Sequence, residues 1–534
     1  MYVHRALARA LHDNGVRELF GLLGDANLHM VNGFTELPGA CYVGVATEGG
    51  AVLAALGYAQ VSGALGVATV THGPGLTNTV TALVEAERAR VPLLLVAGDT
   101  PVSAHDHIQD IDQRPVALSA GAGFQQIRSG ASAVADLAAA MRRAWNERLP
   151  IVANVPIDLL WDEVDYAPVA AGRTAPVAPE PEEPAVEDAV GVIASASRPV
   201  VLAGRGVAVS GAVAEVLKLA ARIGAPVATT LRGKDLFAGQ PHDLGIFGSL
   251  SDDVATEVIG RADCVVAFGC GLNRWTAAEG GLLRGKGVVH VDADPGRLNR
   301  FSPVTVAVAG DAARTAAAFI RLLDEAEIAP TRFVEDAVAK LATRRQPPAR
   351  ERGADSAIDL GTALRRIDAA VPRDRVLVTD NGRFILKAFT ALHVEDPRLY
   401  AHAVNFGAIG LGMATALGAS YAEPGRPVLA AIGDGGFALG GLSDLVTAVT
   451  LNRRIIVVLL NDGAYGAEYV QLRDRGLDPA LATLRWPDFG PVARAIGAQG
   501  HTVRTVRELD EALGVADFDA GPVLLDVRID PDYA

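Results

Sequence analysis

The chain has 534 residues, a length that predicts about three domains. Its net charge of −14 is spread along the sequence, which argues against a surface for nucleic acid or for anionic membranes. Half of the residues are hydrophobic but only 5% are aromatic, so we expect a core of Ala, Val and Leu. Such a core is typical of α/β proteins, in which Ala-rich helices cover Val-rich parallel sheets.

The three cysteines, Cys41, Cys264 and Cys270, lack the spacing of metal ligands and are too few for a disulfide scaffold. We expect them to be small buried hydrophobic residues in a reducing cytoplasm. The N-terminal segment predicts an amphipathic helix that contains Arg and His, unlike a signal peptide. No run approaches the ~18 apolar residues of a membrane span. These patterns predict a cytoplasmic protein.

Residues 1–165 alternate predicted helices and strands in the manner of a parallel βα series. Helices are expected at 3–14 and 51–62, and strands at 18–23, 42–46, 66–71, 92–97 and 150–155. Residues 166–186 are rich in Pro, Ala and Glu, a composition typical of an extended linker.

A second α/β unit is predicted for residues 187–335, with strands at 199–203, 226–230, 264–268, 287–292 and 304–308. A basic, Pro-containing linker is expected at 336–356. The third unit, 357–534, has expected strands at 375–379, 455–460 and 522–528, and residues 403–410 are expected to open a helix of small residues. The first and third units are similar in length and pattern. We therefore predict an α/β protein with three domains, each a mostly parallel sheet flanked by helices.

Two polar turns in the third unit each follow an apolar strand: Gly433-Asp434-Gly435-Gly436-Phe437 and Asn461-Asp462-Gly463. Open α/β sheets bind ligands at the carboxyl ends of their strands. Glycines let the backbone approach a phosphate, and N–H groups at a helix start face an anion. The side-chain oxygens of Asp434 and Asn461, with a carbonyl near Gly463, suit six-coordinate Mg²⁺ beside a diphosphate. A bare Gly-Asp-Gly is usually a surface turn, but both strand contexts favour a binding site.

Asn461 lies 27 residues after Asp434, and this pattern resembles the fingerprint of thiamine diphosphate (ThDP) enzymes. The resemblance covers essentially the whole chain and is strongest to the acetolactate synthase, benzoylformate decarboxylase and pyruvate decarboxylase group. It implies a pyrimidine-binding domain, a central Rossmann-like domain and a diphosphate-binding domain, in that order. It also implies two cofactors, ThDP and Mg²⁺, with Asp434, Asn461 and Gly463 at the metal.

The run that begins Thr47-Glu48-Gly49-Gly50 resembles the catalytic-glutamate segment of the family. The resemblance implies that Glu48 hydrogen-bonds the pyrimidine ring and promotes proton removal from the thiazolium C2. The alternative is an acid that favours the dipole of its own helix. Ile409 matches the residue that bends ThDP, and Gly407 matches the carbonyl that accepts from its exocyclic amine. An ordinary core Ile is the alternative at 409.

The resemblance assigns further residues to the cofactor cradle. Gly435, Gly436 and Gly466 lend close backbone approach, and Asn381 and Arg383 lie in the first cradle loop. Arg383 either neutralises phosphate or is a solvated loop residue. Asn78, at the end of the run His72-Gly-Pro-Gly-Leu-Thr-Asn78, completes the predicted cofactor-binding set.

The segments that indicate the substrate resemble different members of the family. The run 72–78 resembles acetolactate synthase except for His72, whereas Gly24-Asp25-Ala-Asn27 resembles pyruvate decarboxylase, in which this Asp handles protons. We predict catalytic roles for Asp25 and His72, since a His can protonate a carbanion near neutral pH; a hydrogen-bonded loop His is the alternative. Further candidates at the substrate are His105, His107, Gln109, Tyr465 and Glu468. The helix after the metal turn lacks the Trp of acetolactate synthase, and Ala467 replaces the Glu of pyruvate decarboxylase.

The predicted function is ThDP- and Mg²⁺-dependent decarboxylation of a 2-oxo acid, followed by protonation to an aldehyde or by carboligation to a second carbonyl. The resemblance implies a homodimer or homotetramer with active sites at the subunit interface. FAD stays possible in the central domain, because residues 291–295 and Asn273-Arg274 resemble its binding segments, although Gly204-Arg-Gly206 departs from the dinucleotide fingerprint. The alternatives are a catalytically silent regulatory subunit and a flavin-linked oxidative decarboxylase.

Overall fold

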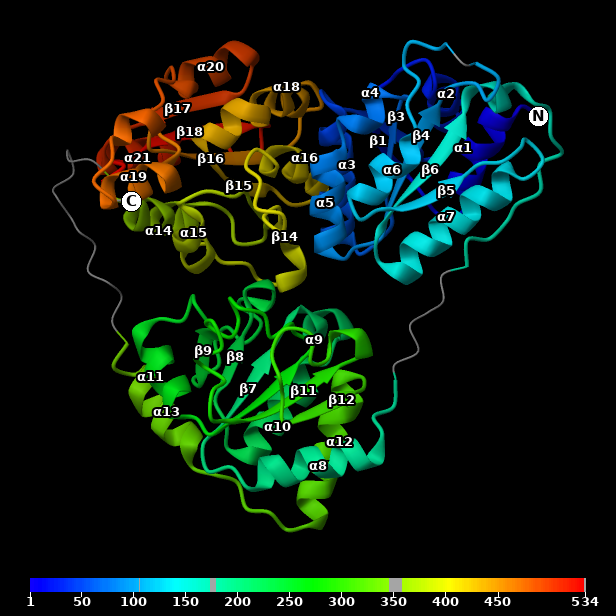
Figure 1. Ribbon diagram of the computed structural model, residues 1–534. Coiled ribbons are helices and arrows are strands. Elements are labelled where there is room, and N and C mark those ends of the chain that lie inside the picture. The colour runs from blue at the N-terminus through cyan, green and yellow to red at the C-terminus, as the bar shows by residue number, and fades with distance from the viewer. Residues whose placement is uncertain (105, 173–178, 345–357, 533–534) are drawn as a thin grey trace. The chain divides into compact units, whose positions relative to one another are not determined.

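The computed structural model describes residues 1–104, 106–172, 179–344 and 358–532. It contains three six-stranded sheets, each flanked by helices, as the sequence predicts (Figure 1). The N-terminal and C-terminal sheets belong to one compact unit, and the central sheet forms the other together with Phe389–Tyr400. No helix of the described residues is long and apolar enough to cross a membrane.

The N-terminal sheet is parallel and has the order β2-β1-β3-β4-β6-β5. Its strands are β1 (Glu18–Gly21), β2 (Cys41–Gly44), β3 (Gly66–Val70), β4 (Leu93–Asp99), β5 (Gly123–Gln126) and β6 (Pro150–Pro156). Its helices are α1 (Val3–Asp13), α2 (Leu28–Thr35), α3 (Glu48–Ser62), α4 (Pro74–Thr77), α5 (Val80–Ala89), α6 (Gln113–Ser119), α7 (Ala133–Glu147) and the 3-10 turn η1 (Ile157–Trp161). Helices α1 and α7 bury their apolar faces, with β3, β4 and β6, in one core.

The C-terminal sheet has the order β14-β13-β15-β16-β18-β17. The strand pairs β13/β15, β15/β16, β16/β18 and β18/β17 are parallel. Its strands are β13 (Val376–Thr379), β14 (Tyr400–His402), β15 (Val428–Gly433), β16 (Ile455–Asn461), β17 (Gln499–Val503) and β18 (Val523–Arg528). Its helical segments are α14 (Leu360–Ala370), α15 (Ile385–Ala391), η4 (Pro397–Leu399), α16 (Gly412–Ala422), α17 (Asp434–Gly436), the π-helical turn η5 (Phe437–Gly441), α18 (Leu442–Thr450), α19 (Gly466–Asp474), η6 (Pro479–Ala482), α20 (Phe489–Ile496) and α21 (Val506–Val515).

The central sheet has the order β12-β11-β10-β7-β8-β9 and is parallel. Its strands are β7 (Pro199–Ala203), β8 (Val227–Thr229), β9 (Asp243–Ile246), β10 (Cys264–Phe268), β11 (Gly287–Asp292) and β12 (Val306–Ala309). Its helices are α8 (Glu183–Ala194), α9 (Arg205–Ser210), α10 (Val213–Ile223), η2 (Leu231–Gly233), α11 (Asp253–Arg261), η3 (Pro295–Arg297), α12 (Ala312–Glu325) and α13 (Phe333–Leu341). Separate apolar cores lie on its two faces.

Numbered within each domain, the outer two sheets share the strand order 2-1-3-4-6-5. The central sheet, numbered in the same way, has the order 3-2-1-4-5-6 of dinucleotide-binding folds. Each order contains two adjacent strands whose connections to the next strand run toward opposite edges of the sheet. A crevice at the carboxyl ends of such a strand pair is the usual ligand site of an open α/β sheet.

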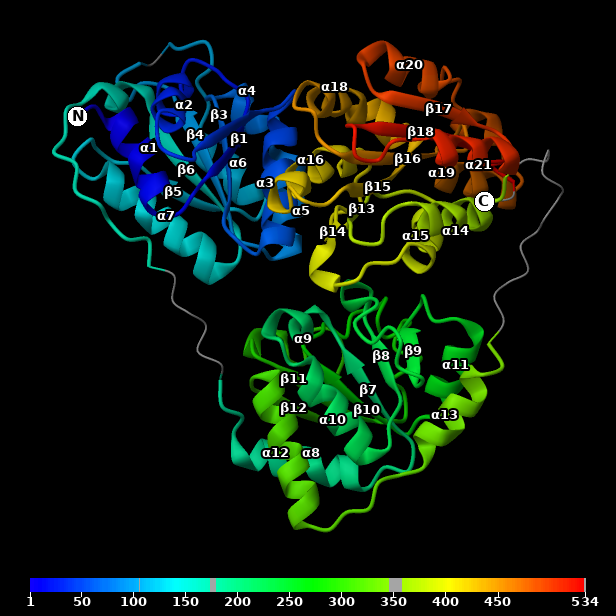
Figure 2. The ribbon, with the colours of Figure 1, turned by 180° about the vertical axis from the view of Figure 1, so that it is seen from behind.

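The N-terminal and C-terminal domains meet where α3 packs on α16, which lie side by side in both views (Figures 1 and 2). Their backbones nearly touch. A Cβ at Gly57 would lie 2.0 Å from the Thr415 carbonyl oxygen, and one at Gly418 would lie 1.7 Å from that of Ala54. Glu85 on α5 adds a polar contact, because its carboxylate accepts from the backbone N–H groups of Asn405 and Phe406 at 2.9 and 2.6 Å.

Four local expectations need correction or addition. Cys41 is exposed, whereas Cys264 and Cys270 are buried as expected. Residues 403–410 do not open a helix, because Gly407 and Gly410 have φ values of 87° and 83°, and α16 begins at Gly412. The strands β5, β9, β14 and β17 were not expected from the sequence. Helix α8 begins inside the stretch 166–186, and α13 covers the first residues of 336–356; the domain boundaries themselves stay a prediction.

Candidate active site

The predicted site residues gather at equivalent places in the two outer sheets. In the C-terminal sheet, Asp380 and Asp434 follow β13 and β15, and Asn461 ends the neighbouring β16. In the N-terminal sheet, Asp25 and His72 follow β1 and β3. Each pair β13/β15 and β1/β3 is the point at which the strand order reverses, so both clusters lie where ligands are expected.

Asp434 is the first residue of α17 and is only 3% exposed. Its Oδ2 is buried and has no hydrogen-bond partner among the described residues. Burial, followed by the nearby charge of Asp462, raises the pKa of Asp434 to about 7. A buried carboxylate oxygen without a donor is unfavourable by itself, and a bound cation would satisfy it.

Asn461 is 1% exposed. Its Nδ2 donates to Asp526 Oδ1 at 2.8 Å, and its Oδ1 accepts from the N–H of Gly463 at 3.2 Å. Gly463 has a φ of 65°, which favours glycine and lets the chain turn directly after the strand. The side chain of Asn461 and the backbone of Gly463 are therefore adjacent, as the metal prediction requires.

The cradle glycines are also close to protein atoms. A Cβ at Gly435 would lie 2.8 Å from the ring of Tyr465, and one at Gly466 would lie 2.3 Å from Oδ2 of Asp462. A Cβ at Gly436 would lie 2.9 Å from the backbone nitrogen of Gly410. A side chain at Gly436 would meet the backbone of Gly410, while one at Gly435 or Gly466 would displace the Tyr465 ring or the Asp462 carboxylate.

Arg383 lies beside this turn. Its Nη1 is 3.9 Å from Asp462 Oδ2 and donates to the carbonyl of Pro531, and its Cδ is 3.1 Å from a Cβ placed at Gly466. The side chain is 16% exposed. Arg383 is thus held in the cluster, and the interpretation as a solvated loop residue is wrong.

The segment that carries Ile409 is held by two neighbouring residues at the end of β13. Asn381 Nδ2 donates to the Gly407 carbonyl at 2.6 Å. Asp380 accepts from the backbone N–H groups of Gly410 and Leu411 at 3.0 and 3.3 Å. Ile409 itself is half-buried, and its Cδ1 is 3.9 Å from a Cβ placed at Gly435. The segment brings Ile409 to the turn at Gly435 and does not bury it as a core residue.

Sequence reasoning missed Asp380, which is fully buried and accepts at least three backbone N–H groups. Burial raises its pKa to about 6, and the hydrogen bonds oppose that shift. The available signal was the same as for Asp434, namely an acidic residue directly after an apolar strand.

In the N-terminal domain, Glu48 begins α3. The N-cap Thr47 accepts from the N–H of Gly50 at 2.9 Å, which explains why the helix starts here. Asn78 Nδ2 donates to Glu48 Oε2 at 3.1 Å. Glu48 is half-buried and Asn78 is exposed, so the predicted pair is assembled at a surface that another molecule can reach.

His72 is fully buried at the end of β3. Its Nδ1 lies 3.1 Å from Thr71 Oγ1 and 3.8 Å from Asp25 Oδ1, and its ring centre is 4.9 Å from that of His107. Its Nε2 has no hydrogen-bond partner in the described part of the chain. Burial lowers the pKa of His72. The predicted catalytic residues Asp25 and His72 are therefore brought together.

The remaining substrate candidates differ in placement. His107 and Gln109 are half-buried in one turn, where His107 Nδ1 accepts from the N–H of Gln109 at 3.2 Å. His105 lies outside the described residues. Tyr465 lies against Gly435 and hence near Ile409, whereas Glu468 is exposed on α19.

Sequence reasoning also missed Gln113, which fixes the turn after His72. This buried side chain accepts from the N–H of Gly73 at 2.9 Å and donates to the Gly98 carbonyl at 2.8 Å and to Asn154 Oδ1 at 2.5 Å. Gly73 has a φ of 56°, and a Cβ there would lie 2.3 Å from the carbonyl oxygen of Gln109. No sequence signal marks Gln113, because its partners are distant along the chain.

Comparison with known proteins decides the family. Three models match in order: the thiamine pyrophosphate enzyme N-terminal TPP binding domain at residues 1–116, the central domain at 186–319, and the C-terminal TPP binding domain at 380–527. The chain belongs to the thiamine pyrophosphate enzymes. This confirms the family and the three-domain α/β architecture predicted from the sequence.

Relatives within this family have different names. The chain is 31% identical to a Pseudomonas aeruginosa protein named "Probable 2-ketoarginine decarboxylase AruI", over 98% of this chain and 93% of that protein. It is 28% identical to the sulfoacetaldehyde acetyltransferase of Castellaniella defragrans, over 95% and 89%. It is also 28% identical to the acetolactate synthase of Arthrospira platensis, over 99% and 94%.

The residues present fit the cofactor pair of this enzyme family. No group of three or more His, Cys, Asp or Glu side chains in the described segments could hold a metal ion. The Asp434 carboxylate, the Asn461 amide and a backbone carbonyl are a different donor set, which depends on further oxygens from a diphosphate and water. The unpartnered Oδ2 of Asp434 is the observation that such an ion would explain.

In the central domain of this thiamine pyrophosphate enzyme, the residues that resemble a nucleotide-binding segment make contacts with nearby residues of their own turns. Asn273 Oδ1 accepts from the N–H groups of Trp275 and Thr276 at 3.0 Å each, and Arg274 pairs with Glu279. A Cβ at Gly204 would lie 2.3 Å from the carbonyl oxygen of Gly269. Contact between two turns thus explains this glycine, and FAD binding in this domain stays an untested alternative.

Proposed function

We propose that this chain catalyses ThDP- and Mg²⁺-dependent decarboxylation of a 2-oxo acid, as a carbon–carbon lyase or transferase. The product is an aldehyde when a proton takes the place of the lost CO₂, or a hydroxyketone when the substrate carbon that lost CO₂ bonds to a second carbonyl. The observation that carries the proposal is the buried, unpartnered Asp434 Oδ2 beside Asn461, in a chain that also presents Glu48 at a helix start. The names of two relatives, a 2-ketoarginine decarboxylase and an acetolactate synthase, support the same reaction class.

The chain's own residues have three tasks in this proposal. ThDP, when bound, supplies the carbon nucleophile and the electron sink. Asp434, Asn461 and the Gly463 carbonyl would hold Mg²⁺, and the loop of Gly407 and Ile409 would contact the cofactor. Glu48, held by Asn78, would be the group that exchanges a proton with the pyrimidine, and His72 with Asp25 would exchange one with the substrate carbon.

The state of His72 suits proton transfer. Burial lowers its pKa, so the ring is neutral near pH 7 and Nε2 or Nδ1 is available as an acceptor. Once protonated next to Asp25, it is a stronger acid than a solvated imidazolium, because its burial favours loss of the proton. It can therefore deliver a proton to carbon and return to the neutral form.

We also propose that the protein works as a homodimer or homotetramer. In the described residues, Glu48 and His72 contact groups of the N-terminal domain, and Asn461 contacts groups of the C-terminal domain. A two-fold pairing that sets the N-terminal cluster of one copy against the C-terminal cluster of another would complete two equivalent sites. Sedimentation with and without ThDP and Mg²⁺ tests this: a monomer with full activity contradicts it.

The decisive experiment is a panel of 2-oxo acids, including pyruvate and 2-ketoarginine, with and without aldehyde or keto acceptors and with sulfoacetaldehyde as a further candidate substrate. Products are identified by mass. Glu48→Gln should abolish turnover while ThDP still binds, because the amide keeps the size of the side chain but cannot release and take up a proton as a carboxyl group does. Turnover by Glu48→Gln at the wild-type rate would rule out the mechanism. Flavin absorbance in the purified protein would favour the oxidative alternative.

A further inference from the structure

The side chain of Asn461 has one allowed orientation, and Asp526 on β18 determines it. Asn461 Nδ2 donates to Asp526 Oδ1 at 2.8 Å, while Asn461 Oδ1 lies toward the turn at Gly463. A carboxylate accepts hydrogen bonds and donates none, so the NH₂ group of the amide must face Asp526. The Asn461 oxygen is therefore left on the side of the Asp462–Gly463 turn, where an oxygen ligand is needed.

Asp526 cannot adjust easily, because both of its oxygens are engaged. Its Oδ2 accepts from the N–H of Phe489 at 2.9 Å and lies 3.5 Å from Arg528 Nε. The residue is 0% exposed, so no water-facing rotamer is at hand. Rotation of the carboxylate would break one of the two hydrogen bonds, and a buried N–H would be left without an acceptor.

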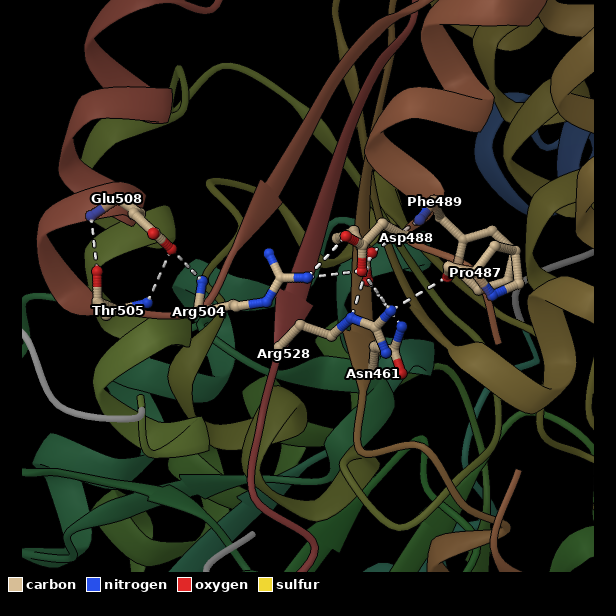
Figure 3. Close-up of polar contacts among 9 residues, drawn as sticks. Asn461, Pro487, Asp488, Phe489, Arg504, Thr505, Glu508 and Arg528 are labelled. Atoms are coloured by element: carbon tan, nitrogen blue, oxygen red, sulfur yellow. Dashed lines mark hydrogen bonds and ion pairs between the residues drawn. The ribbon is translucent and has the colours of Figure 1, made fainter. Parts of the chain in front are cut away.

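A second row of contacts holds the Phe489 N–H in place (Figure 3). The guanidinium of Arg528 donates to the Pro487 carbonyl at 3.1 Å and to Asp488 Oδ1 at 2.9 Å. Arg504 donates to both oxygens of Asp488 at 2.7 Å. Figure 3 shows the contacts that join Arg528 to Pro487 and Asp488, and Asp488 to Arg504. The segment before α20 is thereby tied to β17 and β18.

We propose that Asp526 is a positioning residue that orients the Asn461 amide so that its oxygen, and not its NH₂ group, faces Mg²⁺. The inference rests on the proposed function, since it takes Asn461 as a metal ligand. Within the described residues, the hydrogen bonds to the Asp526 side chain come from Asn461 and the Phe489 N–H, and of these two residues only Asn461 belongs to the proposed cofactor site. Its effect on the metal is therefore indirect, as is usual for residues that orient ligands.

The substitution Asp526→Asn tests the orientation directly. The new amide keeps its oxygen toward the Phe489 N–H, because the opposite rotamer would place two donors together. Its NH₂ group then faces Asn461, which must turn its own oxygen inward to accept. An NH₂ group is left toward the metal, and it has no lone pair to offer. We expect the affinity for Mn²⁺, used as a probe for Mg²⁺, to fall by about 10–100-fold.

Exchanging the side chains of Asn461 and Asp526 should restore Mn²⁺ binding. In the double variant Asn461→Asp with Asp526→Asn, the carboxylate at position 461 accepts from the new NH₂ group with one oxygen and offers the other to the metal. In Asn461→Asp alone, two carboxylates face each other in a buried place, and binding should be weak. Each single substitution therefore weakens Mn²⁺ binding, while the double variant recovers it.

The experiment measures Mn²⁺ affinity of the full-length protein with ThDP by electron paramagnetic resonance, together with thermal unfolding. The matched control is Asp510→Asn, the same substitution at an exposed ion pair with Arg366 in the same domain, which should bind Mn²⁺ like the wild type. A wild type that binds no Mn²⁺ contradicts the proposed function. If the wild type binds Mn²⁺ and Asp526→Asn binds it equally well, the positioning role is wrong. Should Asp526→Asn fail to fold, a double variant that binds no tighter than Asn461→Asp overturns the inference.

Discussion

The N-terminal and C-terminal sheets share one strand order but carry different groups at the same edge. In the C-terminal sheet, Asp380, Asp434 and Asn461 are at most 3% exposed. In the N-terminal sheet, the side chain of Asp25 is 62% exposed and Asn78 is exposed, while His72 is buried. The comparison teaches that the topology selects where a site lies, and the residues that follow each strand select its chemistry. We interpret the buried side as built for ions and the open side as built for a substrate.

The largest effect on activity is expected from replacing His72, the buried residue of the N-terminal cluster. His72→Phe keeps much of the volume but removes both ring nitrogens. We expect kcat/KM for the accepted 2-oxo acid to fall by about 10²–10⁴-fold, the usual contribution of a general acid–base group. Mn²⁺ affinity should not change, because the contacts of His72 are with Thr71, Asp25 and His107. A loss of Mn²⁺ binding in His72→Phe would show that the N-terminal and C-terminal clusters do not act independently.

The matching substitution on the buried side is Asp434→Ala. We expect Mn²⁺ affinity to fall by about 100-fold or more, since even residues that only orient metal ligands contribute up to that factor. Titration with Mn²⁺ in the presence of ThDP measures the change. Asp474→Ala on exposed α19 removes the same group from the same domain and serves as the control. An Asp434→Ala variant with wild-type affinity would remove this residue from the metal site.

A smaller effect is expected at Asp380, which holds the Ile409 segment. Asp380→Asn replaces one acceptor oxygen by a donor, so the N–H of Gly410 or that of Leu411 loses its partner. An unsatisfied buried donor costs about 1–3 kcal/mol, and we expect roughly tenfold weaker ThDP binding together with a lower Tm. Asp374→Asn, at an exposed pair with Arg426, should change neither quantity. Unchanged ThDP affinity in Asp380→Asn would separate this residue from the cofactor site.

The smallest effect is a pH dependence of the metal-free protein. The pKa of Asp434 is raised to about 7 in the fold, so the folded state holds this proton more tightly than the unfolded chain. Its contribution to stability is therefore present below the ordinary Asp range and is lost as pH rises toward 7. Asp434→Asn removes this term, so its metal-free Tm should fall less than that of the wild type between pH 5 and about 8. Equal pH profiles for the two proteins would contradict the raised pKa.

The sequence was sufficient where a local pattern carries the information. Apolar runs predicted the central strands of each sheet, because a strand buried on both faces is a continuous hydrophobic segment. Acidic and amide residues directly after such runs predicted Asp434 and Asn461 at one edge. The edge strands β5 and β17 were missed because Gly123–Gln126 and Gln499–Val503 are short and contain few apolar residues.

Other parts of the site depend on contacts between distant residues. Asp526 and Gln113 act on Asn461 and Gly73, and nothing near them in the sequence shows those partners. The helix expected from residue 403 begins at Gly412 instead, since the positive φ values of Gly407 and Gly410 and the hydrogen bonds to Asp380 fix an irregular segment. Small residues alone did not distinguish such a loop from a helix.

The crossing of α3 and α16 has a consequence for protein engineering. Because Gly57 and Gly418 bring backbone against backbone, a larger residue at either position would push the two helices apart. A library aimed at new substrates can therefore vary residues around His107, Gln109 and Tyr465 while leaving Gly57 and Gly418 untouched. Selection would then act on residues predicted to lie at the substrate, and the framework that carries Glu48 would stay the same across the library.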